Sequence, residues 1–268
     1  REALWYYMAA TPRPCFNPRL LERIREFQNA VAARQREPGE EPVRYIVAAS
    51  RIPGIWNLGG DLSLFRRLIT TRDRDGLLRY ARACIDVLYT NAVGFGQDVT
   101  TISLVQGDAL GGGFEAAISS HVLVAERGAR LGFPEVLFNL FPGMGAYNLL
   151  SRRLDPHRAE KIITSGKLYT AEELYDLEVV DVLAQPGEGD AAVIDYIRQE
   201  NRHRNGLRAF RAARASEHPL THRELMDGAV IWVDAALRLE QRDLRMMDRL
   251  VSRQSAGAQT RKSPDMAS

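Results

Sequence analysis

Lysine is scarce in this chain of 268 residues: only three of its 36 basic residues are lysines, Lys161, Lys167 and Lys262. We attribute this preference for arginine to genomic base composition. Because 34 acidic residues nearly balance the basic ones, the formal net charge is only +2. A charge this small does not favour a nucleic-acid partner.

Cysteine is also scarce, since the chain has only Cys15 and Cys84. Two cysteines exclude a disulfide framework and predict a reducing compartment. The five histidines are scattered, and none belongs to a His-Glu-x-x-His motif, so the sequence gives no support for a metal site.

Long apolar runs are absent as well. No stretch approaches the roughly 18 residues that a membrane span requires, and there is no signal-peptide pattern. We therefore expect a cytoplasmic protein without a membrane span. The first residue is Arg1 rather than Met, so we also expect that a native N-terminal segment is missing.

The pattern of apolar and turn-forming residues predicts an α/β fold. Strands are predicted at residues 4–9, 45–49, 101–105, 121–125 and 179–183. Helices are predicted at residues 17–33, 61–69, 74–92, 113–119, 146–154, 156–165, 171–177, 191–202 and 221–253. Alternation of strands and helices favours right-handed crossovers in a largely parallel sheet. We divide the chain into an α/β core (1–185), a helical C-terminal region (186–254) and a disordered tail (255–268).

Three consecutive glycines, residues 111–113, follow a predicted strand and open a predicted helix. Glycine lets a backbone approach a ligand closely, and amides at a helix start can hold an anionic oxygen. Alone the triplet is a weak signal, because such runs often mark only a turn. A second pair, Gly59 and Gly60, also lies before a predicted helix. On adjacent parallel strands, the two segments could each donate one N–H to a single thioester oxygen.

Two glutamates accompany the glycine triplet. Glu115 lies among apolar residues one turn into the predicted helix, where a carboxylate needs a partner or a task. Burial would raise its pKa toward the range of an acid/base catalyst. Glu135 follows Pro134, which predicts a new helix start there. Its plain interpretation is that it complements the helix dipole. The twenty residues between the two glutamates leave room for the chain to return and place them face to face.

These motifs resemble a known family. NLGGD at residues 57–61, QGDALGGGFE at 106–115 and PE at 134–135, in this order and spacing, resemble the enoyl-CoA hydratase/isomerase (crotonase) superfamily. The resemblance extends from residue 4 to about 250. It implies a spiral of β-β-α units with a helical C-terminal region.

The resemblance also implies roles for individual residues. The backbone N–H groups of Gly60 and Gly112 would form the oxyanion hole, and Glu115 and Glu135 would be the catalytic carboxylates. The presence of both acids favours hydratase or dehydratase chemistry over isomerase or decarboxylase chemistry. Which glutamate takes the C2 proton stays open.

A closer resemblance is to the diffusible-signal-factor synthases of the RpfF type. It is carried by FEAA at residues 114–117, PEVLFNLFPGMGAY at 134–147, WVD at 232–234 and MDRLV at 247–251. It implies a bacterial dehydratase and thioesterase that converts 3-hydroxyacyl-acyl carrier protein to a free cis-2-unsaturated fatty acid, a quorum-sensing signal. The implied partners are acyl carrier protein, a sensor kinase, and further copies in a homotrimer or a dimer of trimers. No cofactor is implied beyond the carrier, or coenzyme A, that holds the acyl thioester.

The acyl chain of such a substrate needs an apolar slot, for which Met144, Trp232 and Leu250 are the candidates. Trp232 and Leu250 are equally consistent with packing between helices. Arg66 and Arg67 could meet a phosphopantetheine group, although a solvated helix face explains them as well. Two other functions stay open: an enoyl-CoA hydratase of fatty-acid oxidation, and a regulatory protein that docks to a sensor kinase.

Overall fold

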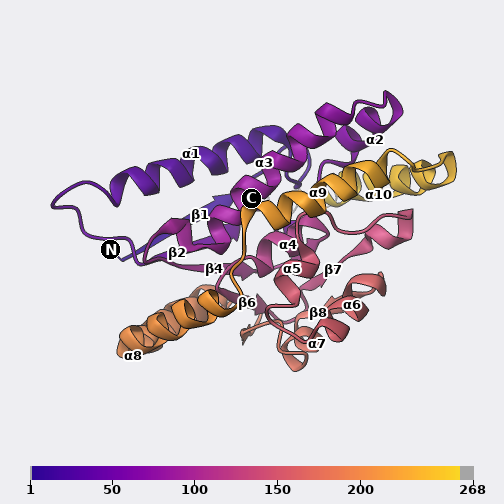
Figure 1. The fold of residues 1–268 in the computed structure, drawn as a ribbon. Helices are drawn as coiled ribbons and strands as arrows, with labels where there is room; N and C mark the ends of the chain where they lie inside the picture. Colours follow the sequence, from indigo (N-terminus) through magenta and orange to yellow (C-terminus); the bar gives the residue numbers. More distant parts are fainter. Residues whose placement is uncertain (1, 260–268) are drawn as a thin grey trace, which may run out of the picture.

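Two sheets form the centre of the fold in the computed structural model, which describes residues 2–259 (Figure 1). The first sheet has five parallel strands in the order β1 (Ala3–Met8), β2 (Tyr45–Ser50), β4 (Thr100–Val105), β6 (Val122–Glu126) and β9 (Val182–Ala184). The second has four short strands in the order β3 (Ile55–Asn57), β5 (Asp108–Leu110), β7 (Arg130–Gly132) and β8 (Leu168–Thr170), of which only β8 is antiparallel to its neighbour. The α/β class and the parallel main sheet are confirmed.

The chain alternates between the two sheets. Strands β2, β4 and β6 of the first sheet are each followed within a few residues by β3, β5 and β7 of the second. The unit β4–β5–α4 (α4, Gly112–Ile118) is the β-β-α unit that the resemblance implies. Because β3, β5 and β7 are parallel neighbours, their carboxyl ends meet at one edge. Those ends lead directly to Gly59, Gly111 and Pro134, so this edge gathers the predicted site.

Helices from the N-terminal half cover one side of the main sheet (Figure 1). They are α1 (Pro18–Arg34) and α3 (Arg74–Ala92), while α2 (Leu62–Thr70) packs on α3. Each starts at a polar side chain that accepts a backbone N–H: Asn17 for α1, Asp61 for α2 and Asp73 for α3. The predicted helices at 17–33, 61–69 and 74–92 are therefore confirmed to within one residue at each end.

The C-terminal part of the chain is helical. It comprises α5 (Ala146–Leu150), α6 (Pro156–Thr164), α7 (Ala171–Asp176), α8 (Gly189–Glu217), α9 (His222–Ala236) and α10 (Gln241–Gln259). Helix α9 packs on α3, and α10 packs on α2 and on the 3₁₀ helix η2 (Pro134–Phe138). Helix α8 instead lies against the opposite side of the main sheet, where Val193 and Ile197 join the core of β2, β4 and β6.

The structure corrects several of the sequence predictions. The single helix predicted at 221–253 is two helices, α9 and α10, and the helix at 191–202 extends to Glu217. The helix at 146–154 ends at Leu150, and the strand at 179–183 begins only at Val182. Helix α10 continues to Gln259, past the predicted start of the tail, and residues 260–268 lie outside the described part of the chain.

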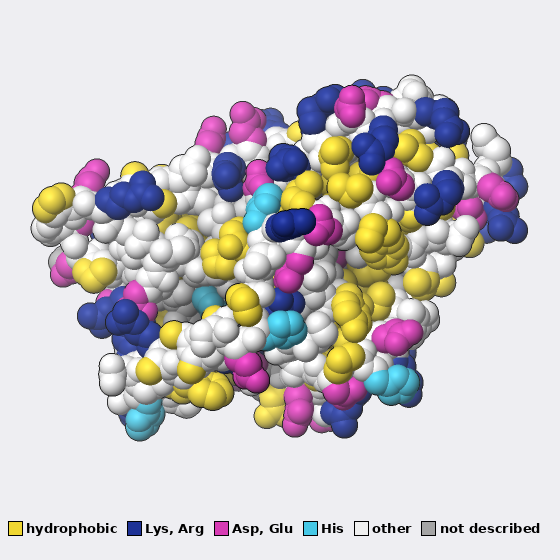
Figure 2. Space-filling model, viewed as in Figure 1, with side chains coloured by type: hydrophobic (Ala, Val, Ile, Leu, Met, Phe, Trp, Pro, Cys, Tyr) yellow, Lys and Arg dark blue, Asp and Glu magenta, His cyan; other side chains and the backbone are white. Residues whose placement is uncertain are grey.

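Within residues 2–259, no helix is both long and apolar enough to span a membrane. The same residues contain no group of three His, Cys, Asp or Glu side chains arranged to hold a metal ion. Figure 2 shows basic and acidic side chains interspersed over one face of the molecule, in keeping with the small net charge.

Candidate active site

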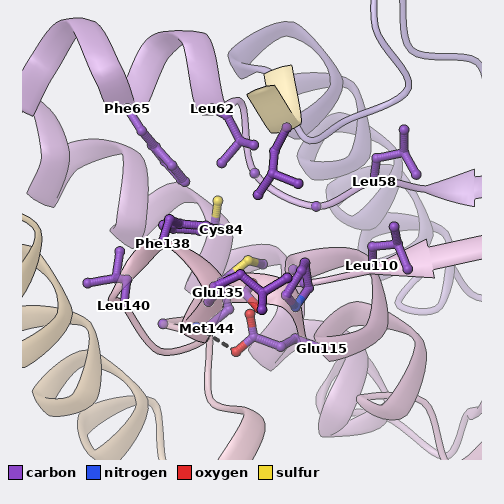
Figure 3. A pocket seen from close by; sticks show the side chains of 18 of the residues that line it. Leu58, Leu62, Phe65, Cys84, Leu110, Glu115, Glu135, Phe138, Leu140 and Met144 are labelled. Atoms are coloured by element: carbon purple, nitrogen blue, oxygen red, sulfur yellow. Dashed lines mark hydrogen bonds between the residues drawn. The ribbon is translucent and has the colours of Figure 1, made fainter. Parts of the chain in front are cut away.

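A cavity of about 480 Å³ opens at the edge where β3 and β5 end. Its polar lining includes Gly59, Gly60, Gly111, Gly112, Glu115 and Glu135, together with the ion pair of Asp108 and Arg130. The rest is mainly apolar and comes from α2, α3, η2, the loop before α5, and the two last helices. Figure 3 shows Glu115 and Glu135 next to each other, with Leu62, Phe65, Phe138 and Leu140 further along the cavity. The fold thus brings all four predicted polar residues to one cavity.

The two glycine segments are in direct contact. A methyl group on Gly112 would lie 3.4 Å from the nitrogen of Gly60, and one on Gly59 would lie 2.9 Å from the nitrogen of Gly112. In the described part of the chain, neither the Gly60 N–H nor the Gly112 N–H donates a backbone hydrogen bond. At Gly112 this follows from its place in the first turn of α4, where N–H groups have no helical partner. Two adjacent, unused donors can stabilise one developing oxyanion.

Glu115 is held by the loop that precedes α5. Its Oε1 atom accepts the backbone N–H groups of Met144 at 2.7 Å and Ala146 at 2.9 Å. Gly145, between the two donors, has φ +103°, a conformation that favours glycine and turns both N–H groups toward one oxygen. Burial raises the pKa of Glu115 to about 8, and the two backbone hydrogen bonds oppose that rise. Oε2 is left for a ligand.

Glu135 lies in the first turn of η2, a short 3₁₀ helix that begins at Pro134, where a helix start is predicted. Its Oε2 atom is buried and has no hydrogen-bond partner in the described chain. Burial, and then the charge of nearby Glu115, raise its pKa well above the usual range. A carboxyl group that only complemented a helix dipole would not need this buried position beside a second acid. The arrangement is suited to a pair that shares protons with a ligand.

Met144, Trp232 and Leu250 all line the cavity. The Trp232 ring packs on Phe65, with centroids 4.9 Å apart, and on the backbone of Gly143. Trp232 and Met144 also belong to the main hydrophobic core, and Leu250 packs against it. The two interpretations of these side chains are therefore compatible, because the cavity is hollowed into the core. A role in acyl binding stays a prediction.

The flanking polar residues are structural. Asn57 Oδ1 accepts the Gly59 N–H at 2.8 Å, and Asp61 caps α2 while pairing with Arg13 at 2.9 Å. Arg66 pairs with Asp248 of α10. Neither Arg66 nor Arg67 lines the cavity, so its lining gives no support for their contact with a phosphopantetheine group.

Sequence reasoning missed Tyr80, which supports the Gly60 segment from α3. Its buried hydroxyl accepts the backbone N–H of Asp61 at 3.2 Å and donates to the carbonyl of Phe16. Phe16 forms an isolated bridge with Gly60. Tyr80 thus ties together the two segments on either side of the possible oxyanion donor. The sequence gave no signal for this role, because Tyr80 lies on the apolar side of a helix and its partner Phe16 is far away in the sequence.

Residues 23–215 match the profile of one protein family, described as enoyl-CoA hydratase/isomerase. The match covers well over half of the chain. The chain belongs to this family. Among curated relatives, it is 37% identical over 101 residues to the fatty acid oxidation complex subunit alpha of Pseudomonas syringae pv. tomato, which is 38% of this chain and 14% of that protein. It is 26% identical over 182 residues to a probable mitochondrial enoyl-CoA hydratase 2 of Arabidopsis thaliana, 67% of this chain and 56% of the relative.

Solved structures share the fold of this enoyl-CoA hydratase/isomerase family member. An enoyl-CoA hydratase from Bacillus halodurans superposes with a TM-score of 0.72 at 18% identity, covering 92% of this chain and 96% of the other. Pseudomonas aeruginosa DspI superposes with a TM-score of 0.65 at 19% identity, covering 81% and 84%. At these identities the likeness establishes the crotonase fold.

Proposed function

We propose that the protein dehydrates a 3-hydroxyacyl thioester and hydrolyses the product, releasing a free cis-2-unsaturated fatty acid. The observation that carries the proposal is the pairing of two buried glutamates with two unused backbone N–H groups in a mainly apolar cavity. Each part answers one need of the reaction: proton transfer, stabilisation of charge on the thioester oxygen, and binding of an acyl chain.

In the dehydration step, one glutamate carboxylate takes a proton from C2, and the electron pair moves toward the thioester carbonyl. The N–H groups of Gly60 and Gly112 stabilise the negative charge that develops on its oxygen. The other glutamate, protonated at the start, gives its proton to the departing 3-hydroxyl group, which leaves as water. A C2–C3 double bond forms, and the pair ends with one proton, as it began.

In the hydrolytic step, a glutamate carboxylate removes a proton from water as its oxygen attacks the thioester carbonyl. The same two N–H groups hold the oxyanion of the tetrahedral intermediate. When the intermediate collapses, the C–S bond breaks and the carrier thiol leaves with a proton. Losing one donor of this kind typically costs roughly 2.7–4 kcal/mol of transition-state stabilisation.

The segment from residue 134 to 147 supports signal synthesis over the ordinary hydration of an enoyl-CoA. It resembles the diffusible-signal-factor synthases, and it forms both η2, which carries Glu135, and the loop whose N–H groups hold Glu115. In the proposed role the protein acts in the bacterial cytoplasm. It takes its substrate from acyl carrier protein, binds a sensor kinase, and assembles as a homotrimer or a hexamer.

Incubation with 3-hydroxydodecanoyl-acyl carrier protein, followed by mass spectrometry, tests the proposal. The expected product is free cis-2-dodecenoic acid. Hydration of trans-2-enoyl-CoA without release of an acid would instead identify an ordinary hydratase. Glu115→Gln and Glu135→Gln should each lower turnover by about 10²-fold or more. If both variants fold, bind the thioester and keep full turnover, the acid pair is not catalytic and a docking role is favoured.

A further inference from the structure

A second cavity, of about 720 Å³, separates the C-terminal half of α8 from α4, α5 and the start of β4. This cleft shares no lining residue with the cavity around Glu115. It is rich in cationic side chains: six arginines line it, Arg152, Arg153, Arg204, Arg208, Arg211 and Arg214. Only three carboxylates do so, those of Asp98, Glu200 and Glu217.

Four of the arginines belong to α8 and face the cleft together, because positions 204, 208, 211 and 214 fall on one side of a helix. This half of α8 follows a break in helical geometry at His203. Its residues are otherwise mostly exposed, so the arginine side is its main connection to the body of the protein.

Three of the arginines are fully engaged by the fold. Arg211 donates two hydrogen bonds, at 2.8 and 2.6 Å, to the buried carboxylate of Glu200. The same carboxylate also accepts a hydrogen bond from the Thr100 hydroxyl. Arg152 pairs with Glu224 and Arg153 with Asp181, and both also donate to backbone carbonyls.

The positive charges of the other three arginines are not each balanced by a carboxylate of their own. Arg204 and Arg208 share the single carboxylate of Asp98, at 3.2 and 3.0 Å. Among the described residues, Arg214 has neither an ion pair nor a hydrogen bond to a side chain. Glu217, three residues after Arg214, also lines the cleft, so the four arginines of α8 face three carboxylates, those of Asp98, Glu200 and Glu217, and positive charge is in excess there.

His121 adds a neutral donor to the cleft wall. Its Nδ1 accepts the backbone N–H of Thr101 at 3.1 Å, and a backbone N–H can only donate, so the proton of the neutral ring is on Nε2. Burial, followed by the charges of Arg211, Arg153 and Arg214, lowers the pKa of His121 to about 4. The ring is therefore neutral near pH 7, and those arginines lie close enough to act on it.

We propose that this cleft binds the phosphate group of a small organic molecule, with Arg208, Arg214 and the Nε2–H of His121 as donors. A phosphate has several acceptor oxygens, and arginine side chains and an imidazole N–H that line one cleft are donors that suit it. The same cleft has apolar lining from Val93, Leu149, Ala212 and Leu220, which fits the organic part of the ligand. Binding would bridge the C-terminal half of α8 and the body of the fold.

Calorimetric titration with inorganic phosphate and with adenosine monophosphate tests the proposal on the full chain. We expect one phosphate site, whose affinity falls about tenfold or more in Arg208→Gln and in Arg214→Gln, since each loses a charge-assisted hydrogen bond. Arg198→Gln is the matched control, because Arg198 lies on the same helix, is 70% exposed and does not line the cleft. Equal binding by all four proteins, or no binding, would overturn the proposal.

Nuclear magnetic resonance of the His121 ring in the folded wild-type protein gives a site-specific readout. Phosphate beside the ring should raise the pKa of His121, because an anion stabilises the imidazolium form. A pKa that stays unchanged at saturating phosphate would refute the assignment. Adenosine monophosphate should bind at least as tightly as phosphate, and weaker binding would rule out the organic ligand.

Discussion

The carboxylate of Glu135 packs against the backbone of Gly111, at the turn where β5 leads into α4. Gly111 has φ +55° and no side chain, and a methyl group there would collide with Oε1 of Glu135. One glycine therefore serves two needs. It permits the turn that starts α4, and it leaves room for an acid next to the Gly112 N–H.

Gly111→Ala should therefore reduce turnover by more than its loss of folding free energy can explain. The backbone strain costs roughly 1–3 kcal/mol, and the added methyl group displaces Glu135 from the cavity. Turnover of a 3-hydroxyacyl thioester and the free energy of unfolding in urea measure the two effects. Gly128→Ala is the matched control, since Gly128 has φ +83° with open space around it. If the two variants lose the same activity, the contact with Glu135 has no catalytic importance.

Tyr80→Phe should lower kcat with little change in KM. The phenylalanine ring would still line the cavity, but the Asp61 N–H and the Phe16 carbonyl would lose their shared partner beside Gly60. Steady-state kinetics measure kcat and KM separately. Tyr45→Phe removes a hydroxyl bound to Asn201, away from the cavity, and is the control. A rise in KM at constant kcat would contradict a role in holding the oxyanion donor.

The rate should increase with pH up to about 8, where Glu115 ionises. The proposed reaction needs one ionised and one protonated glutamate. The charge on ionised Glu115 raises the pKa of Glu135 further, so the two carboxyl groups lose their protons in separate steps. Activity should fall again when the second carboxyl group ionises. A pH profile of kcat/KM checks this, and a maximum at pH 5 would contradict it.

Glu115→Gln should flatten the dependence of stability on pH. The folded-state pKa of Glu115 is raised from 4.5 to about 8, so the folded protein holds this proton more tightly than the unfolded chain. Its contribution to stability is complete below pH 4.5 and is lost as pH rises through 8. Urea unfolding at pH 5 and pH 8 should show a decrease for the wild type and a smaller one for the variant. Equal decreases would contradict burial of an ionising Glu115.

Much of the fold could be predicted from local signals. Helix α3 was placed at its observed bounds because Asp73 caps it and its apolar residues repeat with helical spacing. The strands β3, β5, β7 and β8 were missed because each has only three residues and, unlike β9, none lies in a longer apolar run such as VVDVL at 179–183. Their pairing depends on partners elsewhere in the chain. The division of residues 221–253 at Leu237 was missed for a related reason, since no proline or glycine marks it.

The candidate site could be predicted where glycines, which free the backbone, lie next to carboxylates, which can transfer protons. The glycine runs next to carboxylates drew attention to these segments, and the roles predicted for Gly60, Gly112, Glu115 and Glu135 came from the resemblance of the motifs to the enoyl-CoA hydratase/isomerase family. The hydrogen bonds from Met144 and Ala146 to Glu115 could not be predicted, since they depend on the path of a loop. The support from Tyr80 was hidden for the same reason: a tyrosine on an amphipathic helix looks like ordinary core.

The wall of the cavity around Glu115 is contributed by residues as far apart as Ile55 and Leu250. A nascent chain emerging from the ribosome therefore has both acids and both glycine segments well before it has α9 and α10. Until those last two helices are synthesised and dock, the cavity lacks the side chains of Trp232 and Leu250. A chain that stops before α9 lacks the wall that Trp232 and Leu250 contribute, so we expect it to lose the proposed acyl-binding slot even though both acids and both glycine segments are present.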